Sequence, residues 1–129
     1  MRQYDPEVAP DPGEWLALDE GDRIHQAGAY HRDAGIDLPN TKVHAAIHTI
    51  VENQIAEGLD CTVRAMARLM KEGLSRHDAL HAIGCVVTEH MHKALRAKDE
   101  GRAKSLLRER IEAEVDRLTA RRWRRRYGS

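Results

Sequence analysis

The chain has 129 residues, which fits one domain, and its 21 basic and 21 acidic side chains give a formal net charge of zero. No run approaches the ~20 apolar residues that a membrane-spanning helix needs, and the acidic start of the chain lacks the apolar segment of a secretory signal, so we expect a cytoplasmic protein. The chain contains no Phe and is rich in Ala, Leu, Arg and Glu, a composition that favours an all-α fold over sheets.

Turn residues divide the first half of the chain into an N-terminal arm and two helices. Residues 1–13 contain three of the four prolines and indicate an extended arm. The first helix is expected from 14 to about 32, with a break near Gly21, because glycine costs a helix about 1 kcal/mol relative to alanine. The clearest helix covers 40–57, where Asn40 or Thr41 can cap the start and Gly58 ends it.

Three further helices are expected in the second half. One spans about 60–72 and ends at Gly73, and the next runs from a cap at Ser75 to about 98. Gly101 marks a break, after which residues 102–126 are expected to form a long basic helix. The five helices predict a compact bundle over 14–100, with 101–129 as a basic helix and tail that packs on the bundle or extends from it.

The chain contains eight histidines, and four of them form two HxxxH pairs, His44 with His48 and His77 with His81. On a helix, side chains four residues apart stand one above the other, so two imidazoles can hold one metal ion. On a helical wheel, each pair lies at the edge of the apolar stripe of its helix, in the same relative place. If the two helices pack antiparallel, four imidazoles converge, which predicts a transition-metal site.

Other side chains are candidates to complete this site. Glu52 follows His48 by four residues and is predicted to be a carboxylate ligand or base, and His31 is a further candidate ligand. Cys85 also lies on this side of its helix, although a small core residue is the better reading of it. A ligand set rich in nitrogen favours zinc or iron, with copper as an alternative, over magnesium or calcium.

The spacing alone leaves the role of the site open. A closed set of four ligands would be structural, whereas an open position would let the ion activate water or oxygen. No glutamate stands between the paired histidines, so a zincin-type protease is not predicted. The alternative without metal is that the histidine pairs line polar seams of the bundle.

Several ordered motifs resemble a family of small bacterial all-helical proteins of unknown function. They are VHAAIHTIVENQ at 43–54, EGL and RHDALHAIG at 72–84, Tyr30-His31 and the LPN run at 38–40, and the resemblance covers about 15–95. Asp78 stands where the family's second motif usually has Glu. The resemblance implies a cytoplasmic bacterial protein in which the histidines are a signature, and it implies no particular activity.

Charge is distributed unevenly along the chain. Residues 1–40 carry a net charge of −6, residues 41–100 carry none, and residues 101–129 carry +6. The basic end surrounds Trp123 and Tyr127 with five arginines, which are Arg121, Arg122, Arg124, Arg125 and Arg126. This pattern predicts, as an alternative function, a nucleic-acid-binding or protein-interaction module. The other interpretation is that Trp123 anchors the helix to the bundle while the acidic and basic ends attract each other, within one chain or across a homo-oligomer.

Overall fold

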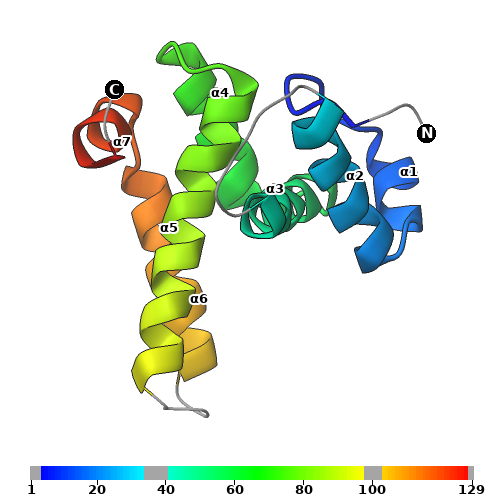
Figure 1. Ribbon diagram of the computed structural model, residues 1–129. Coiled ribbons are helices and arrows are strands. Elements are labelled where there is room, and N and C mark those ends of the chain that lie inside the picture. The colour runs from blue at the N-terminus through cyan, green and yellow to red at the C-terminus, as the bar shows by residue number, and fades with distance from the viewer. Residues whose placement is uncertain (1–3, 34–40, 98–102, 128–129) are drawn as a thin grey trace.

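The computed structural model describes residues 4–33, 41–97 and 103–127, which form seven helices and no strand (Figure 1). The helices are α1 (Pro12–Ala17), α2 (Glu20–Asp33), α3 (Thr41–Ala56), α4 (Asp60–Lys71), α5 (Arg76–Ala97), α6 (Ala103–Arg117) and α7 (Ala120–Tyr127). The all-α prediction is confirmed, whereas the count of five helices was wrong. Within the described ranges, no helix is long and apolar enough to cross a membrane.

The count was wrong because two of the expected helices are each divided by a capping residue. The carboxylate of Asp19 accepts a hydrogen bond of 2.8 Å from the Asp22 N–H, so α2 begins there and the break precedes Gly21. The hydroxyl of Thr119 likewise accepts from the Arg122 N–H at 3.1 Å and begins α7. The expected basic helix of 102–126 is therefore two helices, and the last of them has only eight residues.

The boundaries around α3, α4 and α5 are those that the sequence predicts. Gly58 and Gly73 adopt φ angles of 73° and 105°, which suit glycine after a helix end. The following residues close the same hydrogen-bonded motif, from the Leu59 N–H to Gln54 and from the Leu74 N–H to Leu69. Ser75 caps α5 by accepting from the Asp78 N–H at 3.1 Å.

Helix α3 lies at the centre of the fold, with α1 and α2 on one side and α5 on the other (Figure 1). Helices α5 and α6 form a long hairpin, against which α4 and α7 pack. The apolar side chains form two separate buried clusters, and α3 contributes Val51 to the larger one and Ala45 to the smaller one. The side chains that α3 buries also include the polar His48 and Glu52.

Helices α3 and α5 approach each other closely at Gly84. A Cβ atom placed on Gly84 would lie 2.1 Å from the Cγ2 of Ile47 and 3.7 Å from the Cγ2 of Val51. No side chain larger than hydrogen fits at this crossing unless the Ile47 side chain or α3 itself moves. Since Gly84 follows His81 by one turn, the close approach brings the histidine-bearing faces of the two helices together.

Candidate metal centre

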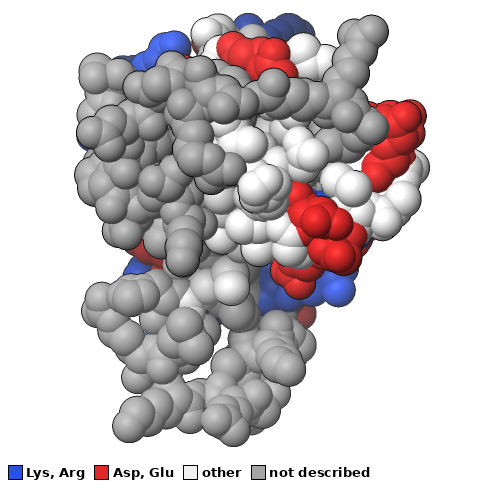
Figure 2. Space-filling view, turned by 45° about the vertical axis from the view of Figure 1, so that its right-hand side comes forward, with Lys and Arg blue, Asp and Glu red and all other residues white. Residues whose placement is uncertain are grey.

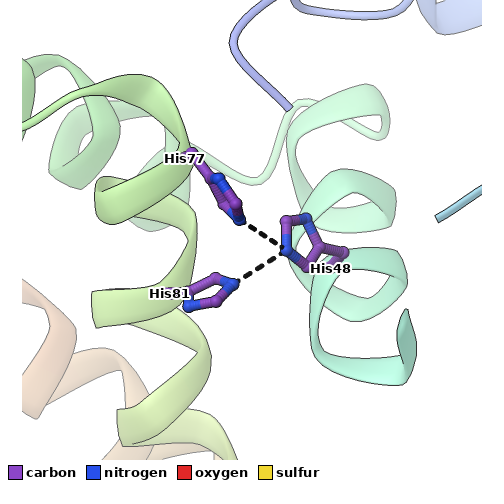
Figure 3. Close-up of side chains that lie close together, drawn as sticks. All are labelled: His48, His77 and His81. Carbon is purple, nitrogen blue, oxygen red and sulfur yellow. Dashed lines mark hydrogen bonds between the residues drawn. The ribbon is translucent and has the colours of Figure 1, made fainter. Parts of the chain in front are cut away.

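Three histidine side chains converge where α3 crosses the first two turns of α5 (Figure 3). The Nε2 atom of His48 lies 2.8 Å from Nε2 of His81 and 3.1 Å from Nε2 of His77. One ligand atom from each ring lies within 4.8 Å of the others, so the group can hold a metal ion. His48 is fully buried, and His77 and His81 are half-buried.

The spacing of the ring nitrogens is close to that of a metal site. Zinc binds histidine at about 2.0–2.1 Å, which puts two nitrogens of a tetrahedral site roughly 3.3 Å apart. The two short separations among the Nε2 atoms are 2.8 and 3.1 Å, so only a small outward movement of the rings would admit an ion. Imidazole nitrogens suit zinc, iron and copper rather than magnesium or calcium.

The contacts between α3 and α5 run in antiparallel order, the condition under which the histidine pairs were predicted to converge. Glu52 meets Arg76, His48 meets His81, and Ile47 meets the position of Gly84. This order explains why His48 faces His77 and His81. The side chains of His44 and His31, which were also predicted as ligands, lie outside the described part of the structure.

Glu52 lies outside the group of converging ligand atoms and has a different set of partners. Its two carboxylate oxygens accept hydrogen bonds of 2.7 and 2.8 Å from the Arg76 guanidinium, and Oε2 also accepts from Tyr4 at 2.7 Å. Glu52 and Arg76 are buried, with side-chain exposures of 0% and 8%. A charge that is removed from water needs an opposite charge and hydrogen bonds, which explains this arrangement.

Tyr4 connects this ion pair to His48. Its hydroxyl donates its proton to Glu52, and its oxygen lies 3.0 Å from Nδ1 of His48. Because the hydroxyl has only one proton, the His48 Nδ1–H is the donor in the second bond. In the neutral imidazole that can bind metal, Nε2 then carries the lone pair and faces His77 and His81. Burial, together with the negative charge of Glu52, raises the pKa of Tyr4 far above its usual value, so the hydroxyl stays protonated.

Sequence reasoning missed Tyr4 and Arg76. Tyr4 stands 44 residues before His48, in a proline-rich segment, and no local spacing connects it to either HxxxH motif. Arg76 directly precedes His77, but its charge gives no sign that it will be buried. Both roles depend on long-range packing, which periodicity does not encode.

Two other side chains near the site, those of Asn53 and Cys85, serve other contacts. Asn53 Oδ1 accepts from the Trp15 indole at 2.9 Å and from Arg23 at 3.1 Å, so it holds α1 and the start of α2 against α3. Cys85 is a half-buried free thiol outside the histidine group, and burial raises its pKa. The interpretation of Cys85 as a small core residue stays a prediction, because its side chain is only half-buried.

No family model matches the chain, and no curated protein and no solved structure matches it either. The resemblance to a bacterial family therefore stays a prediction, and the function has to be argued from the site.

Proposed function

We propose that this protein binds one transition-metal ion, zinc or iron, through the Nε2 atoms of His48, His77 and His81. The observation that supports this most strongly is the convergence of three imidazoles from two helices. The His48 ring is also oriented by a hydrogen bond at Nδ1, the nitrogen that faces away from the other two rings. In known histidine metal sites the ring nitrogen that does not bind metal is hydrogen-bonded to a carboxylate, a carbonyl or water. Here the Tyr4 hydroxyl, itself bonded to Glu52, takes that place.

Three protein ligands leave one position of a tetrahedral ion for another group. In catalytic zinc sites that position holds water or substrate, and in structural sites a fourth side chain closes it. His44, the remaining member of the HxxxH pairs, is the residue to test. His44→Ala should lower the metal affinity in a closed structural site and leave it nearly unchanged in an open one.

Metal binding is tested by titrating zinc into the protein in competition with a chromophoric chelator. The double variant His48→Ala/His81→Ala should lose tight binding, whereas His25→Ala, which removes an exposed histidine of α2, should bind like the unmodified protein. Affinity should fall steeply below about pH 6, because imidazole binds metal only after it loses its proton. Equal binding by the double variant and the control would contradict the proposal.

A second candidate function is contact with an anionic partner through α7. Arg121, Arg122, Arg124 and Arg125 are exposed, and none of them makes an ion pair within the described part of the chain. Trp123 packs against the larger apolar cluster, which supports its role as an anchor and leaves arginines rather than this indole to contact a partner. This favours contacts with phosphate or carboxylate groups over stacking on bases.

A further inference from the structure

We propose that residues 4–7, here called the strap, position the histidines for metal, so that the strap and the ion bind cooperatively. The inference rests on the proposed metal-binding function and adds a part of the chain that the HxxxH motifs do not contain. Its basis is that the strap contacts both histidine-bearing helices at the converging side chains.

The first contact is with α3. Tyr4 is buried, with an exposure of 3%, and its hydroxyl bridges Nδ1 of His48 and Oε2 of Glu52 at 3.0 and 2.7 Å. This bridge orients the His48 ring and keeps the lone pair of Nε2 directed at the other two rings. The Tyr4 ring also packs against Trp15, with centroids 5.5 Å apart, which fixes the position of the hydroxyl.

The second and third contacts are with the start of α5. The carbonyl of Pro6 accepts a hydrogen bond of 2.8 Å from Arg76, the same guanidinium that binds Glu52. The carboxylate of Glu7 accepts a bond of 2.6 Å from the backbone N–H of His77. This amide belongs to the first turn, where helix N–H groups have no partner within the helix and an acidic group is favourable.

The local sequence gives the strap a defined shape. Asp5-Pro6-Glu7-Val8 forms a turn in which the Val8 N–H donates to the Asp5 carbonyl at 3.0 Å, and the Asp5 side chain accepts from the Glu7 N–H at 2.9 Å. Asp at the first position and Pro at the second are the residues such turns favour. The turn presents Pro6 and Glu7 to α5 while Tyr4 reaches α3.

Two ligands are therefore held by contacts from one segment. Removal of a side chain that hydrogen-bonds to a metal-bound histidine typically weakens metal affinity 10–100-fold. By thermodynamic linkage, whatever the strap adds to metal affinity, the metal adds to docking of the strap. Bound metal should then shift the equilibrium between the undocked and docked strap toward the docked state by the same factor.

The test uses Tyr4→Phe, which keeps the ring against Trp15 and removes only the hydroxyl, in the full-length protein. We expect its zinc affinity, measured by chelator competition, to be about 10–100-fold weaker than that of the unmodified protein. Glu7→Gln should weaken binding to a smaller extent. Glu14→Gln, which makes the same change in charge at an exposed site of α1, should have no effect.

The melting temperature distinguishes a role of Tyr4 in positioning the histidines from a merely structural role. A structural defect would lower the melting temperature of the metal-free protein and leave the increase on adding zinc unchanged, whereas loss of positioning should reduce that increase. Hydrogen exchange gives the reciprocal readout. Zinc should slow exchange at the amides of residues 5 and 7 in the strap, and at the Val8 amide that closes its turn, in the unmodified protein and not in His48→Ala/His81→Ala.

The outcomes distinguish the two proposals. If the unmodified protein binds zinc and Tyr4→Phe binds it equally well, the strap does not position the site, although metal binding stands. If the unmodified protein binds neither zinc nor iron, the proposed function fails and the inference fails with it. Weaker binding in Tyr4→Phe together with zinc-dependent protection of the strap would support both.

Discussion

Glu52 and Arg76 form an ion pair whose side chains are almost completely removed from water. The Tyr4 hydroxyl connects this pair to His48. Removal of one partner of such a pair leaves a buried charge uncompensated, which typically costs about 3–5 kcal/mol. Glu52→Ala should therefore lower the free energy of unfolding, measured with urea on metal-free protein, by about this amount.

The matched control for this prediction is Arg64→Ala. It breaks the pair with Asp116, across a similar 3.0 Å distance, and the pair with Asp60, but all three side chains are about half exposed or more. Exposed pairs contribute about 0–1 kcal/mol. Similar losses of unfolding free energy in the two variants would show that burial does not increase the contribution of the Glu52–Arg76 pair to stability.

For single residues, the sequence predicts the histidine ligands better than it predicts the side chains that contact them. His48, His77 and His81 were identified because an i,i+4 spacing on an amphipathic helix is a local property. Glu52 was singled out for the same reason, but its orientation toward Arg76 and Tyr4 depends on which elements pack behind α3. Helical spacing carries no information about that.

Gly84 controls the separation of α3 and α5 and offers a test at the scale of the helices. In Gly84→Ala the new methyl group would overlap Ile47, a β-branched residue with little rotamer freedom. Overpacking of this kind costs about 1–3 kcal/mol, and displacement of α5 should also weaken zinc binding because His81 is one turn away. Urea unfolding and chelator competition measure the two effects.

Gly21→Ala is the control, because a Cβ atom there meets only the Asp19 carboxylate at 3.4 Å. Since alanine favours a helix more than glycine does, this variant should be neutral or more stable by up to about 1 kcal/mol. Equal behaviour of the two glycine variants in both measurements would mean that the close approach does not matter.

The helix boundaries show what local sequence can and cannot predict. The ends at Gly58 and Gly73 and the cap at Ser75 were predicted because glycine and serine act there through their own backbone or side chain. The break in the first expected helix was predicted near Gly21, next to the cap that Asp19 forms in the structure. The break at Thr119 was missed because apolar residues continue at helical spacing on both sides of it. Threonine can cap a helix, but the apolar stripe that continues past Thr119 favoured one continuous helix.

The two oppositely charged regions lie on different sides of the whole molecule. Helices α1 and α2 lie far from α7 (Figure 1), and acidic side chains gather at the right of the face that Figure 2 turns forward. Among the side chains before α3 that the structure describes, the exposed acidic ones are Asp5, Glu7, Asp11, Glu14, Asp19, Glu20 and Asp22. No ion pair joins this region to α7 within the described residues. We propose that the two regions attract each other between copies of the chain.

This arrangement predicts reversible self-association that salt weakens, because charges on exposed surfaces are screened over about 10 Å at 0.1 M salt. Sedimentation should show a larger average mass at low salt and a monomer at high salt. Arg121→Gln/Arg125→Gln should remove the dependence, whereas Lys71→Gln/Arg110→Gln, an equal change of charge at other exposed sites, should not. An unchanged mass at all salt concentrations would contradict self-association. Binding of nucleic acid through α7 would instead favour nucleic acid over a second copy of the chain as the partner of α7.

Metal binding by the three histidines is the central claim, and elemental analysis tests it most directly. Tag-free protein purified without chelator would be analysed by plasma mass spectrometry beside His48→Ala/His81→Ala and His25→Ala. The account predicts about one equivalent of zinc or iron in the unmodified protein and in His25→Ala, and none in the double variant. No metal in the unmodified protein, and none taken up when zinc or iron is added, would contradict it.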